Sequence, residues 1–135
     1  MTRFFFFHKK YLKTTFREYT KNELMFGKVP SFDAYMTGSD QVWNCKFTKG
    51  DSNFMLKFAP SDAPRLSYSS SFASSSITKE YQQSFKEELD KYDTILVREK
   101  SGVDIVRDLT GKKAEVVCDP TLRTKNIMFW HQGEN

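Results

Sequence analysis

The chain has 135 residues, 39% hydrophobic and 28% charged, which predicts one soluble globular domain with a real core. Its net charge of +4 is concentrated in residues 1–28, which hold seven Lys or Arg against two Asp or Glu. Because no helix-turn-helix, zinc-finger or RRM pattern accompanies this basic segment, we expect a solvated helix face there and no nucleic-acid binding.

Two cysteines, Cys45 and Cys118, lack paired spacing, which argues against a disulfide framework or a zinc site and favours a reducing compartment. The phenylalanines at positions 4–7 are too few for a secretory signal, and no window approaches the roughly 18 apolar residues of a spanning helix. We therefore expect a cytoplasmic protein without a membrane span. Aromatic residues make up 16% of the chain, enough for a core with some rings left to line a pocket or meet a partner.

The N-terminal part of the chain predicts helices followed by strands. Apolar residues at helical spacing indicate an amphipathic helix within residues 3–17. Thr20 is placed to cap a short second helix, which Gly27 closes. Residues 32–38 read as a buried strand, and residues 54–60 read as a candidate short strand inside an irregular segment.

From residue 65 onwards, strands and helices alternate. Residues 65–72, 94–97 and 114–118 are predicted strands. The first two are separated by a predicted helix over residues 78–92, which Thr78 can cap and whose apolar face is formed by Tyr81, Phe85, Leu89 and Tyr92.

A second, shorter helix is predicted to start at Ser101, with Asp104 completing a capping box and Gly111 as its stop. Strands that alternate with helices of this length form parallel sheets with right-handed crossovers. The sequence therefore predicts an α/β fold.

Polar residues follow each predicted strand, at the edge where open parallel sheets bind ligands. They are Gly38, Ser39, Asp40 and Gln41 after the first strand, Ser69, Ser70 and Ser71 at the end of the second, Arg98, Glu99 and Lys100 after the third, and Asp119 after the fourth. This concentration of polar groups predicts a site. No histidine lies within residues 9–130, which argues against histidine as a general base in this domain.

Each of these residues also has a purely structural interpretation. Gly38 suits a tight turn, Asp40 suits a helix cap, and the serines suit close packing. Arg98 and Glu99 can pair with each other at the surface for little energy. Asp119 before proline is a common turn device. Trp43 is better interpreted as a core residue than as a platform for a sugar.

Three segments, "FDAYMTGSDQVWN", "RLSYSSSFA" and "YDTILVREKSGVDIVRDLTGKKAEVVCDPTL", resemble the polysaccharide pyruvyl transferase family in order and spacing. The upstream "FHKKYLKTTFREYTKNEL" is similar to the helical segment that precedes the GSDQVWN motif in that family. The family transfers a pyruvyl group from phosphoenolpyruvate to a sugar hydroxyl of cell-surface polysaccharides, forming a ketal. The resemblance implies a Rossmann-like parallel sheet flanked by helices, one half of a GT-B fold. It implies phosphoenolpyruvate as donor substrate and no metal or organic cofactor.

The resemblance also suggests which residues act. We assign Arg98 to contact with the anionic donor, because its fork suits carboxylate and phosphate, and Asp40 to orienting or deprotonating the acceptor hydroxyl. These two are the catalytic candidates. The substrate-binding candidates are Gly38, Ser39, Gln41, Asn44, Ser70, Ser71, Glu99 and Asp119.

Family members are longer than this chain. The resemblance therefore implies that residues 1–135 are most of an N-terminal domain, without its first strand and without the second domain that supplies further basic residues. We expect the chain alone to be inactive, and to pair with the missing domain or form a homodimer. Two alternatives stay open: a non-catalytic sugar- or protein-binding module, and a nucleotide-sugar glycosyltransferase-like domain, although the glycine-rich phosphate loop of the latter is missing after the first strand.

Overall fold

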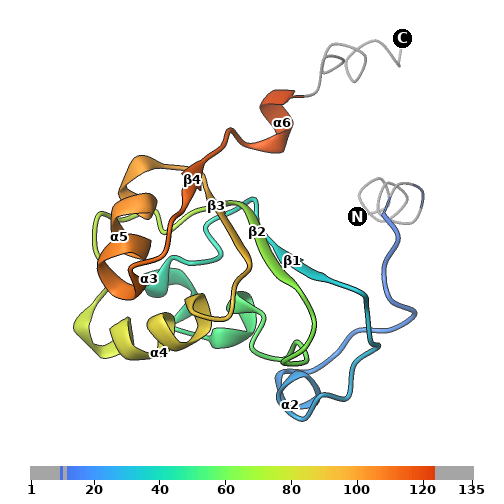
Figure 1. Ribbon diagram of the computed structural model, residues 1–135. Helices are drawn as coiled ribbons and strands as arrows, with labels where there is room; N and C mark the ends of the chain where they lie inside the picture. The colour runs from blue at the N-terminus through green and yellow to red at the C-terminus, as the bar shows by residue number, and fades with distance from the viewer. Residues whose placement is uncertain (1–9, 11, 124–135) are drawn as a thin grey trace, which may run out of the picture.

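Four parallel strands form one sheet in this computed structural model, which describes residues 10 and 12–123. The strands lie in chain order: β1 (Tyr35–Thr37), β2 (Arg65–Ser70), β3 (Thr94–Val97) and β4 (Glu115–Val116) (Figure 1). The α/β fold and the parallel sheet predicted from the sequence are confirmed.

The connections between the strands carry the helices. They are α3 (Cys45–Thr48), the 3-10 helix η1 (Ser52–Met55), α4 (Lys79–Leu89) and α5 (Lys100–Thr110), while α2 (Lys21–Met25) precedes the sheet and α6 (Pro120–Arg123) follows it. Because the strands are added in chain order, crossovers of one hand bring these connections to the same face. Figure 1 shows α3, α4 and α5 gathered on one side of the strands. On the other face, Met36 is 68% exposed.

The core lies between the sheet and these helices. Trp43 is fully buried, and its ring packs against Phe72 at 5.1 Å between centroids and edge-on against Tyr92 at 5.6 Å. Phe85 and Leu89 bury the apolar face of α4, as predicted. The interpretation of Trp43 as a core residue is confirmed.

A buried ion pair closes the core at the start of β2. Nη1 of Arg65 lies 3.4 Å from the Glu88 carboxylate, and both side chains are almost fully buried. Nη2 of Arg65 donates to the carbonyl oxygen of Ala59 at 2.6 Å, and Nζ of Lys91 lies 2.9 Å from Glu88. Each charge therefore has a partner, which buried charges require.

One prediction for the first half of the chain is wrong, and another is tested only in part. Of the helix predicted within residues 3–17, Lys10 is helical and residues 12–17 are not, and the others lie outside the described residues. Residues 54–60 do not form a strand, because η1 and turns occupy this segment. The carboxylate of Asp51 caps η1 by accepting from the amide of Asn53 at 3.1 Å, and Leu56 ends it in a left-handed conformation.

The strand predicted at residues 32–38 is shorter and less buried than expected. Only Tyr35–Thr37 pair with β2, and of these only Tyr35 is buried. The strand predicted at residues 114–118 is likewise reduced to Glu115–Val116. The strand positions are confirmed; the bounds predicted for residues 94–97 are those of β3, and the other three strands are shorter than predicted.

Some of the predicted helix caps are present and others are not. Thr20 and Glu23 form a reciprocal capping box on α2, and Gly27 follows with φ +64°, as predicted. Thr78 is the N-cap residue of α4, but its side chain makes no capping hydrogen bond.

The N-terminus of α5 differs from the predicted capping box. Glu99 is the N-cap residue, and the Asp104 carboxylate accepts from Nη1 of Arg107 at 2.8 Å, because an acid and a base three residues apart meet on a helix surface. Gly111 ends α5 with φ +73°, as predicted.

Candidate functional site

The residues that follow the first three strands lie together at the carboxyl edge of the sheet. The amide of Ser71 donates to the carbonyl oxygen of Asp40 at 3.0 Å, which joins the ends of β1 and β2. Nη1 of Arg98, at the end of β3, donates to the carbonyl oxygen of Ser39 at 3.3 Å. The predicted gathering of polar strand ends on one edge is therefore present.

Gly38 permits the close contact between the ends of β1 and β2. Its φ is +125°, a conformation that favours glycine, and a Cβ here would collide with the carbonyl oxygen of Tyr68. The hydroxyl of Ser70, 3.0 Å from the same Cβ position, donates to the carbonyl oxygen of Thr37 at 3.2 Å. Gly38 therefore sets the backbone position from which the next residues project.

The loop from Asp40 to Asn44 is held at both ends. The amide of Trp43 donates to the carbonyl oxygen of Ser71 at 3.1 Å, and the Asn44 side chain caps α3 by accepting from the amide of Lys46 at 3.1 Å. Nδ2 of Asn44 also donates to the side-chain oxygen of Gln41 at 3.0 Å. The hydrogen bond between the side-chain amides of Asn44 and Gln41 thus helps to fix the loop. The exposed carboxylate of Asp40 projects from this loop.

Arg98 lies half-buried between two carboxylates. Its Nη1 is 3.5 Å from Asp119 and its Nε is 4.0 Å from Glu99. Hydrogen bonds from Thr121 to Asp119, and after them the charge of Arg98, hold the pKa of Asp119 below its usual range. An anionic ligand of Arg98 would therefore compete with Asp119 and Glu99 for the guanidinium.

The carboxylate of Glu99 is hydrogen-bonded to the chain that follows β2. Its Oε1 accepts hydrogen bonds from the hydroxyl of Ser71 at 3.0 Å and from the amides of Phe72 and Ala73 at 2.8 and 3.2 Å. Ser70 and Ser71 are fully buried. These internal bonds stabilise the strand ends, and a part in substrate binding stays a prediction for these three residues.

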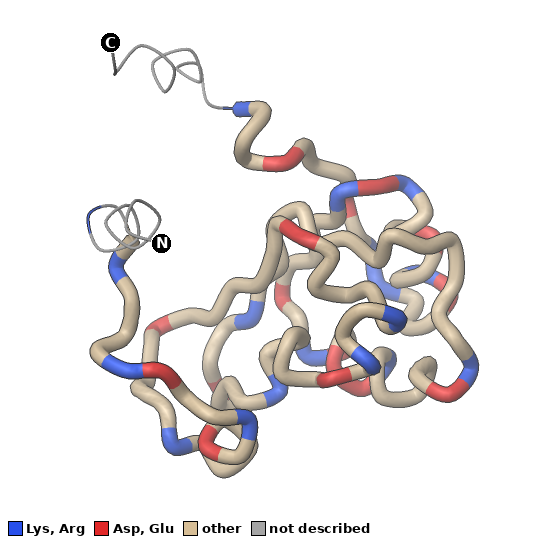
Figure 2. Tube along the Cα trace, turned by 180° about the vertical axis from the view of Figure 1, so that it is seen from behind, with Lys and Arg blue, Asp and Glu red and all other residues tan. Residues whose placement is uncertain are grey.

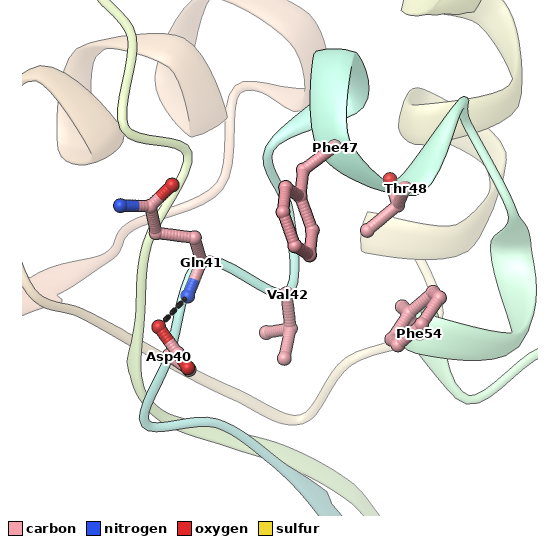
Figure 3. A pocket seen from close by; sticks show the side chains of 6 residues that line it. All are labelled: Asp40, Gln41, Val42, Phe47, Thr48 and Phe54. Atoms are coloured by element: carbon pink, nitrogen blue, oxygen red, sulfur yellow. Dashed lines mark hydrogen bonds between the residues drawn. The ribbon is translucent and has the colours of Figure 1, made fainter.

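A pocket of about 340 Å³ opens beside Asp40. Its lining consists of Asp40, Gln41, Val42, Phe47, Thr48 and Phe54. Figure 3 shows the Phe47 ring reaching down from α3 and the Phe54 ring on η1, with Val42 and Thr48 between them. Sequence reasoning included Asp40 and Gln41 but missed the other four. The signal that could have found them is a pair of phenylalanines in a segment otherwise rich in Lys, Asp, Ser and Gly.

Charges of both signs are distributed over the described chain, as Figure 2 shows. The basic N-terminal segment is partly neutralised: Nη1 of Arg17 lies 2.7 Å from Glu23, and Nζ of Lys21 lies 2.9 Å from Asp51. The second pair also connects α2 to the N-cap of η1. These acidic partners reduce the local charge that a nucleic acid would need.

Neither a disulfide nor a metal cluster is formed by the described residues. Cys45 is buried and Cys118 exposed, and both are free thiols. Within residues 10 and 12–123, no His, Cys, Asp and Glu side chains are grouped to share a metal ion, and no helix could cross a membrane. His8 and His131 lie outside this range.

Comparison with known families decides the relationship. The sequence model of the family described as "Polysaccharide pyruvyl transferase" matches residues 2–134, nearly the whole chain. The chain belongs to this family. No curated protein and no solved structure matches it. The pyruvyl transferase match spans all four strand ends, and so includes the edge that carries Asp40 and Arg98.

Proposed function

We propose that this chain contributes one side of a pyruvyl transferase site, at which phosphoenolpyruvate and a polysaccharide hydroxyl pair form a pyruvyl ketal. The reaction protonates the methylene carbon of the donor, which becomes a methyl group. Two sugar oxygens bond to the adjacent carbon, and the carbon–oxygen bond to phosphate breaks. Of the two hydroxyl protons, one ends on the methyl carbon and the other leaves with phosphate.

Asp40 is the proposed acceptor-side group. One of its carboxylate oxygens accepts from the amide of Gln41 at 2.7 Å, which fixes the side chain at the mouth of the pocket. An oriented carboxylate can accept a hydrogen bond from a sugar hydroxyl and remove its proton as the new carbon–oxygen bond forms. This assigns Asp40 to orienting and deprotonating the acceptor.

Arg98 is the proposed donor-side group. A guanidinium can bind the carboxylate or the phosphate of phosphoenolpyruvate through two parallel hydrogen bonds. Asp119 and Glu99 already compensate part of its charge. We therefore include in the proposal a second domain, which supplies further cations for the donor, and we expect no turnover from this chain alone.

The observation that supports this proposal best is the hydrogen bond between Arg98 and Ser39, in a chain of this family. It holds the donor-side candidate against the loop that carries the acceptor-side candidate. Two groups that act on one bond-forming step must lie within reach of a common substrate atom.

A transfer assay tests the proposal. The chain is mixed with phosphoenolpyruvate and a bacterial surface polysaccharide, with and without the separately produced C-terminal domain of a longer family member. Phosphate release and the ketal methyl signal in proton NMR are measured. We expect product only with the added domain, and a loss of at least about a hundredfold in rate for Asp40→Asn. An unchanged rate for Asp40→Asn would contradict its role, and turnover by the chain alone would contradict the need for a second domain.

Donor binding is tested separately, by titrating phosphoenolpyruvate into the labelled chain together with the added domain and following amide chemical shifts. Arg98→Gln is expected to weaken binding by about tenfold or more, because a charged hydrogen-bond donor is lost. The matched control is Arg107→Gln, an exposed arginine that pairs with Asp104 on α5. Equal affinities for the two variants would exclude Arg98 from the donor site.

A further inference from the structure

Two exposed aromatic rings line the pocket beside Asp40. Phe47 is 82% exposed and Phe54 is 46% exposed, although burial would stabilise each ring. Other apolar side chains of this chain are exposed as well, so exposure alone indicates nothing. These two differ because they line one cavity together with a carboxylate, an amide and a hydroxyl.

Short hydrogen-bonded elements fix the backbone that carries the two rings. Phe47 belongs to α3, whose first turn is capped by Asn44. Phe54 belongs to η1, and its carbonyl oxygen accepts from the hydroxyl of Thr37 at the end of β1, at 3.0 Å. Because this backbone is already ordered, binding costs mainly the rotamer freedom of the two side chains, which favours affinity.

The polar part of the pocket suits a ligand rich in hydroxyl groups. Asp40 presents a carboxylate, which can only accept hydrogen bonds when ionised. The hydroxyl of Thr48 donates to the carbonyl oxygen of Asn44 at 3.1 Å, so its oxygen is left as an acceptor. A sugar has hydroxyl donors around its rim and an apolar face of carbon-bound hydrogens, which packs on aromatic rings. At about 340 Å³ the pocket is near the lower end of small-molecule sites, enough for one ring.

We infer that this pocket binds one pyranose ring of the acceptor polysaccharide, with Phe47 as the stacking surface and Asp40 as the group that accepts hydrogen bonds from its hydroxyls. The inference rests on the proposed function, since it makes the pocket the acceptor subsite of that reaction. It adds Phe47, Phe54 and Thr48 as residues that determine which sugar is accepted.

The test is a binding titration that needs no catalysis. The isotope-labelled full chain is titrated with methyl β-D-galactopyranoside, methyl β-D-glucopyranoside and methyl α-D-mannopyranoside, and amide shifts are followed. At least one glycoside is expected to shift residues of the pocket. Phe47→Ala and Asp40→Asn are expected to weaken that binding by about tenfold or more. Phe16→Ala is the matched control, because Phe16 is 87% exposed and does not line the pocket, and it is expected to bind like the unchanged chain.

Three results would overturn the inference: no pocket shift with any of the glycosides, unchanged affinity for Phe47→Ala, or an equal loss for Phe16→Ala. The outcome is independent of the transfer assay. Glycoside binding that depends on Phe47, in a chain that forms no ketal even with the second domain added, would keep the sugar site and reject the proposed reaction. Ketal formation that is unaffected by Phe47→Ala would keep the reaction and reject this site.

Discussion

The carboxylate of Glu99 accepts a hydrogen bond from the hydroxyl of Ser71 at 3.0 Å and so connects the end of β3 to the end of β2. The same oxygen accepts from two backbone amides that follow Ser71. An acidic side chain therefore replaces the ladder hydrogen bonds where the two strands stop pairing. This connection keeps the chain after β2 in place beside the candidate site.

Replacement of Glu99 by Ala is expected to lower the free energy of unfolding by about 2 kcal/mol, because a hydroxyl and two amides lose a charged acceptor. Urea denaturation measures the change. In the control, Glu87→Ala, the carboxylate accepts from the exposed side chain of Gln83, and the expected change is within about 0.5 kcal/mol. Equal losses for the two variants would mean that the Glu99 carboxylate does not stabilise the strand ends.

Gly38→Ala is expected to destabilise the chain by about 3 kcal/mol or more, because the new methyl group would collide with backbone of β2 at a φ that alanine rarely adopts. Thermal or urea unfolding gives the value. Gly27→Ala is the control, since Gly27 also has a positive φ but no atom of the described residues lies within 4 Å of its Cβ position. We expect the control to lose about 1 kcal/mol. A loss for Gly38→Ala no larger than that of the control would contradict the close contact with Tyr68.

Arg65→Met is expected to cost about 3 to 5 kcal/mol, because the buried Glu88 then keeps, among the residues that the structure describes, only Lys91 as a charged partner. Lys86→Met removes an exposed pair with Asp90 and is expected to cost less than about 1 kcal/mol. The double variant Arg65→Met with Glu88→Leu should recover much of the loss, since it removes the unpaired charge as well. A double variant less stable than Arg65→Met would show that the ion pair is not the source of the effect.

The capping box of α2 predicts an acid-sensitive helix. The hydrogen bond from the Thr20 amide, and after it the one from Arg17, lower the pKa of Glu23 from 4.5 to about 2. A carboxyl whose pKa is lower in the folded chain stabilises it above pH 4.5, and this contribution disappears as the pH falls towards 2. A carbon-13 titration of Glu23 should give a midpoint near 2, and Arg17→Ala should raise it. A midpoint near 4.5 in the unchanged chain would contradict the capping box.

The sequence predicted the fold class because strand and helix signals agree over residues 65–110. The β3 segment buries Ile95 and Val97, the β2 segment buries small serines after Arg65, and Gly111 marks the end of α5. Residues 49–60 could not be predicted, because the path of the chain there depends on Lys49 and Leu56 in left-handed conformations, which these residue types do not favour. Tertiary packing of Met55 and Leu56 stabilises that path.

The candidate site was predictable in position but not in detail. The rule that parallel strands end at one edge grouped Asp40, Ser71 and Arg98 correctly. It could not distinguish the exposed Asp40 from the buried Ser71, because burial depends on how the chain turns after β2, where Ala73 adopts a φ of +47°. The pocket was missed because Phe47 and Phe54 become neighbours only through the turns between α3 and η1.

The position of Trp43 provides a spectroscopic probe for this region. The indole of Trp43 is fully buried, and Trp43 belongs to the loop that carries Asp40. The backbone amide of Trp43 donates to the carbonyl oxygen of Ser71. The only other tryptophan of the sequence is Trp130. In a Trp130→Phe variant, all indole fluorescence would come from Trp43. A red shift of the emission would show that the loop has moved and that solvent reaches the indole.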